Sequence, residues 1–147
     1  MTDHDALNDA LDALDGAGTV EVERPGGRAE VDVVDAGRLG VSVRRVKVHR
    51  DQAVDVADEA RELPERLRAL PERVAPVEVD PTLGGARLRT RPDELRGRDF
   101  FEVDVAPHDT EVRRTRIDED GQRHPADFTL TREQLERLIE QTGGPPR

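Results

Sequence analysis

The stretch TVEVERPGGRAEVDV, residues 19–33, decides the fold class. On each side of its central RPGG sequence, valines alternate with charged residues, most of them acidic. A period of two sends successive side chains to opposite faces of a strand, and proline and glycine favour a tight turn between two strands. The stretch therefore predicts an antiparallel hairpin with one apolar face and one charged face.

Strand-like alternation recurs along the chain and is separated by segments with helical spacing. Leu7, Leu11 and Leu14 share one helical face near the start, and Leu135 and Leu138 share one near the end. Short connections between strands favour antiparallel pairing. The sequence therefore predicts an α+β fold with the order α-βββ-α-β(β)βββ-α, in which helices pack mainly on one face of an antiparallel sheet of about six to eight strands.

Three boundaries can be placed within this outline. At Arg44 and Arg45 the alternation slips, which indicates a β-bulge or the exit of the strand from the sheet. Asp51 is placed to cap the second helix. Thr131 and Gln134 have the spacing of a capping box and predict the start of the last helix.

Composition limits the class of protein. The 147 residues include no cysteine, which excludes disulfides and thiol chemistry, and their 34% apolar fraction suits one domain. We assign that domain to residues 1–142 and a flexible tail to residues 143–147. A net charge of −10 and an aromatic content of 2% disfavour nucleic-acid binding. The lack of a leader-like or membrane-spanning apolar run predicts no membrane partner and a cytoplasmic location.

The predicted strands of the second half carry charges of alternating sign on their polar face. These charges are Glu78 and Asp80, then Arg87, Arg89 and Arg91, then Glu102 and Asp104, then Arg114 and Arg116. Opposite charges on neighbouring strands stabilise a sheet by about 0.2–1 kcal/mol per pair, and ion pairing is therefore the favoured interpretation. An anion-binding groove lined by the arginines is the alternative.

Two features are candidates for partner binding. Asp5, Asp9 and Asp12 lie on the polar side of the first helix and form an acidic strip that could mimic spaced phosphates or meet a basic partner. Phe100 faces the charged side of its strand if Phe101 points into the core. An exposed Phe100 would anchor a partner, and burial under the loop of residues 91–98 is the competing interpretation.

The turn at Asp120 and Gly121 could gather metal ligands. Asp118, Asp120 and His124 surround this turn and supply oxygen and nitrogen donors, although a solvated turn explains the same residues. The sequence predicts no cofactor and no catalytic residue. Ser42, the single serine, lies inside a predicted strand and not at a nucleophile elbow.

These features favour a non-catalytic, acidic protein-binding adaptor, either chaperone-like or regulatory, with a protein partner. The element order is similar to that of type III secretion chaperones, a similarity of fold that implies protein binding. One alternative is a small metal-assisted hydrolase centred on the Asp118 turn, and another is an acidic DNA-mimicking inhibitor that uses the first helix. A homodimer is also open, because a sheet with a thin core gains burial by pairing.

Overall fold

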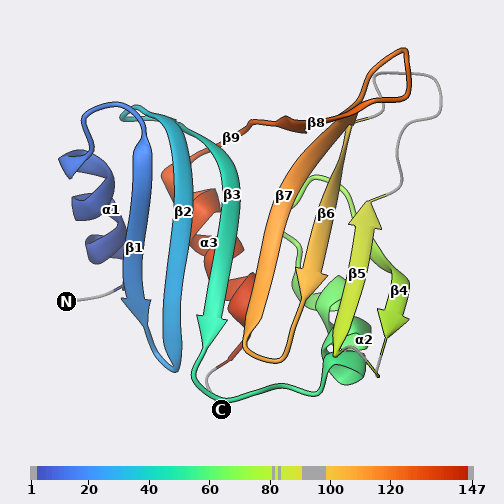
Figure 1. The fold of residues 1–147 in the computed structure, drawn as a ribbon. Helices are drawn as coiled ribbons and strands as arrows, with labels where there is room; N and C mark the ends of the chain where they lie inside the picture. The colour runs from blue at the N-terminus through green and yellow to red at the C-terminus, as the bar shows by residue number, and fades with distance from the viewer. Residues whose placement is uncertain (1–2, 81, 83, 91–98, 146–147) are drawn as a thin grey trace.

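The computed structural model describes residues 3–80, 82, 84–90 and 99–145 (Figure 1). Within these residues the chain forms three helices and nine strands, one strand more than the upper end of the expected range. The expected order of helices and strand groups is confirmed, with six strands instead of four or five between the second and third helices. The elements are α1 (Asp3–Ala13), β1 (Gly18–Arg24), β2 (Gly27–Ala36), β3 (Val41–Arg50), α2 (Val56–Arg66), β4 (Val74–Asp80), β5 (Gly85–Thr90), β6 (Asp99–Val105), β7 (Asp109–Ile117), β8 (Arg123–Ala126), β9 (Phe128–Leu130) and α3 (Arg132–Gly143).

All nine strands belong to one antiparallel sheet. Seven of them form its main order, β1-β2-β3-β7-β6-β5-β4, and β8 and β9 pair at its side. β7 pairs with β3 as far as Arg113 and with β8 from Arg114 onwards. β3 pairs with β9 over residues 41–43. The sheet therefore splits between β3 and β7, and the segment β8–β9 crosses between these two strands at the top of Figure 1.

A β-bulge lies beside this split. Asp32 pairs with Arg45, and the next residue, Val33, pairs with Val43, so that Arg44 is the extra residue of β3. This register confirms the bulge that the slipped alternation predicts. Such an insertion bends the strand and changes the direction of a side chain.

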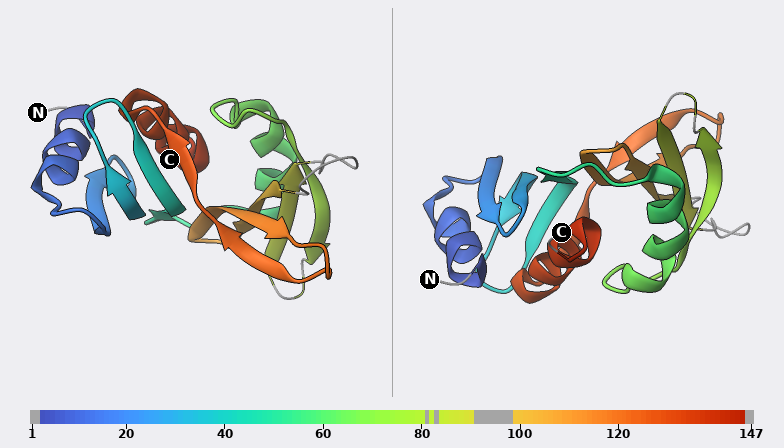
Figure 2. Two further views of the ribbon diagram at one scale, coloured as in Figure 1. Left: turned by 90° about the horizontal axis from the view of Figure 1, so that it is seen from above. Right: turned by 90° about the horizontal axis from the view of Figure 1, so that it is seen from below.

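The helices lie on one face of the sheet, as predicted (Figures 1 and 2). α1 packs against β1, α3 against β3 and β7, and α2 against β4 to β6. The apolar strand faces and helix faces meet in a core of valine and leucine, in which Val31, Val43, Val46, Leu63, Leu88, Leu135 and Leu138 are all buried. Phe101 contributes the inward ring of its doublet and meets Phe128 edge to face, with the ring centroids 5.1 Å apart.

The helix boundaries agree with the sequence in one case and differ in another. At α3 the capping box is confirmed, because the Thr131 hydroxyl accepts from the Gln134 N–H and the Gln134 side chain accepts from the Thr131 N–H. At α2 the prediction is wrong: Asp55, not Asp51, is the cap. The N–H of Asp51 donates to the carbonyl of Gly26 at 2.9 Å, which holds this residue in the preceding loop.

The packed fold extends beyond the predicted boundary at residue 142. Gly143 ends α3, and Gly144 is buried. The Arg24 guanidinium donates to the Gly144 carbonyl at 3.1 Å, and a Cβ at position 143 would lie 1.9 Å from Arg24 Nη1. Of the predicted tail, Arg147 and the residue before it lie outside the described residues. No helix in the described ranges combines the length and apolar character needed to cross a membrane.

Candidate functional site

The face of the sheet opposite the helices, which we call the open face, carries charged side chains from five neighbouring strands. Within the described residues, no helix packs over it (Figures 1 and 2). The strand register places on it Arg28, Glu30 and Asp32 of β2, Arg45, Lys47 and His49 of β3, Glu111 and Arg113 of β7, Glu102 and Asp104 of β6, and Arg87 and Arg89 of β5. Positive and negative groups are interleaved across it.

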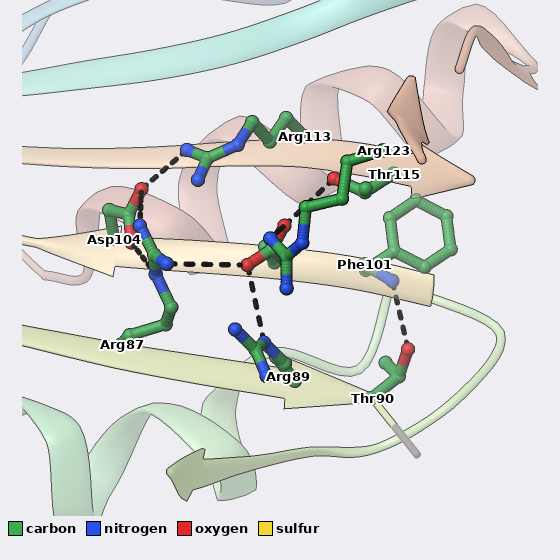
Figure 3. A network of polar contacts seen from close by, with 9 residues as sticks. Arg87, Arg89, Thr90, Phe101, Asp104, Arg113, Thr115 and Arg123 are labelled. Carbon is green, nitrogen blue, oxygen red and sulfur yellow. Dashed lines mark hydrogen bonds and ion pairs between the residues drawn. The ribbon is translucent and has the colours of Figure 1, made fainter. Parts of the chain in front are cut away.

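Glu102 is the buried centre of this surface, with 1% of its side chain exposed. Its carboxylate accepts hydrogen bonds from the Thr115 hydroxyl at 2.8 Å and from Arg89 Nε at 3.2 Å. Arg123 Nη1 of β8 donates to it at 3.3 Å, and Arg87 Nη1 lies 3.7 Å away. Figure 3 shows Arg89, Arg123 and Thr115 converging from three strands.

Asp104 is the second carboxylate of the network. Arg87 Nε donates to it at 2.7 Å, and Arg113 donates from the other side (Figure 3). Four arginines, from β5, β7 and β8, therefore share the carboxylates of Glu102 and Asp104. Within this network, four positively charged guanidinium groups surround two negatively charged carboxylates.

The environment keeps both carboxylates ionised. Burial raises the pKa of Glu102, but the hydrogen bond from Thr115 and the positive charge of Arg113 more than offset it, so that the pKa is lowered. Burial likewise raises the pKa of Asp104, and the hydrogen bonds from Arg87 and Arg113 lower it further than burial raises it. The hydrogen bond to Asp104 in turn raises the pKa of Arg87. The network is a set of fixed charges at neutral pH.

The predicted charge ladder is present between β4, β5 and β6. Glu78 and Asp104 both pair in register with Arg87, and Arg89 pairs with Glu102. Ion pairs join Arg87 to Asp104 and Arg89 to Glu102. These arginines bind carboxylates of the chain itself, as the ion-pairing interpretation requires.

At β7 the predicted ladder is wrong, because the strand presents its odd-numbered residues. Val112 is fully buried in the core, so its neighbour Arg113 lies on the open face in place of Arg114 and Arg116. Arg114 pairs instead with Asp99, at 3.4 Å. Arg91 lies outside the described residues.

Phe100 faces the charged side, as predicted, but it is buried and not exposed. Only 2% of the residue is accessible. The guanidinium carbons of Arg89 and Arg123 lie 5.6 and 5.7 Å from its ring centroid, within the range of cation–π contacts. Phe100 therefore supports the arginines of the network instead of presenting a ring to a partner. The loop of residues 91–98, the predicted cover, lies outside the described residues.

The hairpin tip brings together two of the three predicted metal ligands. His124 Nε2 lies 2.6 Å from Asp118 Oδ2, and this contact is the main cause of the lowered pKa of Asp118. Asp118 Oδ1 accepts from the backbone N–H groups of Asp120 and Gln122, so Asp120 contributes its backbone to the turn. The turn at Gly121, with φ of 80°, is as predicted. In the described part of the chain, no group of three side chains suited to a metal ion is found.

The acidic strip of α1 is interrupted by an arginine. Asp12 accepts from Arg132 Nη1 of α3 at 2.7 Å, so one of its charges is paired within the chain. Asp9 is exposed, and the side chain of Asp5 lies outside what the structure describes. The strip is therefore a weaker phosphate mimic than three free carboxylates would be.

A second buried carboxylate, Glu59, lies on the helix side of the sheet. Arg66 donates to both of its oxygens, at 3.0 and 2.7 Å, and also to the Gln141 carbonyl at 2.7 Å. Arg50 lies 3.9 Å from Glu59 and donates to the hydroxyl of Thr110 at 2.8 Å. This cluster joins α2, α3, β3 and β7. The sequence gives no local signal for it beyond the spacing of Glu59 and Arg66 along one helix.

Sequence reasoning also missed Arg113, Thr115 and Arg123 as members of the open-face network. Their roles depend on which strands pair with β7, and the sequence pattern does not specify this. Comparison of the chain with protein-family models, with curated proteins and with solved structures gives no match. The similarity to type III secretion chaperones therefore stays at the level of element order.

Proposed function

We propose that the chain is a non-catalytic protein-binding module, regulatory or chaperone-like, that recognises a protein partner through the open face. The observation that carries this proposal is the asymmetry of the sheet. One face is packed by three helices, and the other carries fixed charges of both signs without a covering helix in the described residues. Complementary charges give an interface its orientation and its selectivity among partners.

The protonation states support recognition over acid–base chemistry. A general acid or base works best when its pKa lies near the working pH. The pKa values of Glu102 and Asp104 are shifted downwards, and both groups are held by arginines. Such groups suit a permanent charge pattern and not proton transfer.

The size of the open face also suits a protein partner. Seven strands in the main order, spaced about 4.8 Å apart, give a width of roughly 30 Å. Strands of 6 to 10 residues, at about 3.3 Å per residue, give a length of roughly 20–30 Å. The resulting area is close to the roughly 800 Å² per partner of a standard protein interface.

Site-specific photo-crosslinking in the organism that encodes the chain tests this proposal. Lys47, near the centre of the open face, is replaced by p-benzoylphenylalanine in the full chain. Glu133 of α3, with 77% of its side chain exposed, is replaced in the same way as the matched control. Circular dichroism establishes that both variants are folded.

We expect irradiation to give a discrete adduct with one other protein from position 47 and none from position 133. The absence of an adduct at position 47, or the same adducts from both positions, would overturn the proposal. An adduct of two copies of the chain from position 47 would replace it with the predicted homodimer.

A further inference from the structure

A hollow of about 370 Å³ opens where β3 and β7 part. Two pairs of consecutive arginines line it, Arg44 with Arg45 from β3 and Arg113 with Arg114 from β7. Consecutive residues of a regular strand point to opposite faces. Arg44 lies at the bulge of β3, and Arg114 lies at the point where β7 exchanges β3 for β8. The guanidinium of Arg114 is directed to Asp99 and the inward ring of Phe101. The bulge and the split therefore lie at the same place as these arginines.

The side chains that line the hollow include more cations than carboxylates. Arg123 and His124 of β8 complete a lining of five arginines and one histidine, against the two carboxylates of Asp32 and Glu102. Asp32 is bound to Arg45, at 3.0 Å, and Glu102 is almost fully buried by its own donors. Arginines thus outnumber carboxylates among the residues that line the hollow. The other lining arginines are also ion-paired, Arg113 to Asp104 and Arg114 to Asp99, with carboxylates that do not line it.

Two of the lining arginines are accessible to a ligand. The side chains of Arg44 and Arg123 are 57% and 49% exposed, and their partners are Asp127, at 3.1 Å, and the shared carboxylate of Glu102, at 3.3 Å. Exposed pairs of this kind contribute little to stability. A bound anion can accept N–H groups of both arginines with little loss to the fold. Thr115, whose hydroxyl donates to Glu102, also lines the hollow.

We propose that this hollow binds a small oxyanion, namely a phosphate group, either free or as the ester of a small molecule. The planar fork of a guanidinium matches the oxygens of a phosphate, and facing arginines can contact it from two sides. The net charge opposes a long polyanion, whereas a small ion contacts only the exposed guanidinium groups at the hollow. This site is independent of the protein partner proposed above.

Thermal unfolding and NMR titration of the full chain test the site with two probes, inorganic phosphate and phenyl phosphate. Sodium chloride at matched ionic strength controls for screening. The test variant is the double variant Arg44→Gln/Arg123→Gln. The matched control is Arg137→Gln of α3, whose side chain is 55% exposed and is also ion-paired, to Glu133.

We expect at least one phosphate probe to raise the Tm of the parent chain and of Arg137→Gln, because a ligand of the folded state stabilises it. Amide signals of Arg44, Thr115 and Arg123 should shift in the same titration. The double variant should bind at least about tenfold more weakly. Tighter binding of inorganic phosphate would assign the site to the free ion, and tighter binding of phenyl phosphate would assign it to an ester.

Three results would overturn the proposal. The first is no binding of either probe up to about 10 mM, at which even a weak ligand of this kind gives a measurable rise in Tm. The second is an equal rise in Tm with sodium chloride, which indicates screening alone. The third is unchanged phosphate affinity in the double variant.

Discussion

Two buried glutamates, one on each side of the sheet, are held by arginines in different ways. Glu59 and Glu102 are 2% and 1% exposed, and each accepts hydrogen bonds from guanidinium groups. Around Glu59 the arginine side chains are less exposed, at 7% for Arg50 and 19% for Arg66. Around Glu102 they are 32% exposed at Arg89 and 49% exposed at Arg123.

We interpret this difference as one between a stabilising cluster and the proposed recognition surface. On the helix side, Arg50 and Arg66 also donate to the backbone carbonyls of Ala106 and Gln141, so the cluster connects elements of the fold. On the open face the arginines share two carboxylates and keep contact with solvent. Under this proposal, the same type of ion pair stabilises the interior in one place and takes part in partner recognition in the other.

The largest effect is expected from Glu59→Gln. The substitution keeps the size of the side chain but removes the buried negative charge that Arg66 and Arg50 approach. Removing one partner of a buried pair costs about 3–5 kcal/mol of unfolding free energy. Urea unfolding measures this loss. A loss below about 1 kcal/mol would show that the cluster does not stabilise the interior.

Glu102→Gln should have a smaller effect, about 1–3 kcal/mol. Its side chain is equally buried, but Arg89 and Arg123 can turn to water once the charge is gone. The same urea experiment compares the two variants directly. If Glu102→Gln lowers the stability as much as Glu59→Gln does, the proposed distinction between the two clusters is lost.

Acidification should weaken the fold through the open face. The pKa values of Glu102 and Asp104 are lower in the folded chain than their ordinary values. Their contribution to stability is therefore complete above the ordinary carboxyl pKa of about 4, and it is lost as the pH falls through the lowered folded values. Unfolding free energies measured across this range should fall less steeply in Glu102→Gln/Asp104→Asn than in the parent chain. Parallel curves would contradict the assignment.

The smallest effect on stability is expected from Arg123→Gln. Because half of this side chain is exposed, its ion pair with Glu102 should contribute less than about 1 kcal/mol. Arg137→Gln on α3 provides a surface pair for comparison in the same unfolding assay. A loss above about 2 kcal/mol for Arg123→Gln alone would place this arginine among the stabilising contacts.

The sequence predicted those features that depend on neighbours along the chain. Alternation around the RPGG turn identifies the first hairpin, the slip at Arg44 identifies the bulge, and Thr131 identifies the start of α3. Each rests on a backbone preference that a few residues specify. The packing of helices on one face follows from the alternation of apolar and charged residues.

Features that depend on distant pairing were not predictable in this way. The face on which Arg113 lies is fixed by the burial of Val112 against strands that are far away in the sequence. Arg123 reaches Glu102 only because β8 folds back along β7. Phe100 was predicted to face the charged side, but its burial depends on arginines from two other strands.

The most direct test of the account measures stability and partner binding on the same variant. Arg123→Gln is combined with the crosslinker at position 47. For this comparison both chains are irradiated in a lysate of the encoding organism exchanged into phosphate-free buffer, so that an anion in the hollow plays no part. The account predicts that the adduct yield falls several-fold while the unfolding free energy changes by less than about 1 kcal/mol. An unchanged adduct yield, or a yield that falls only in proportion to a loss of folded protein, would contradict a recognition role for the open face.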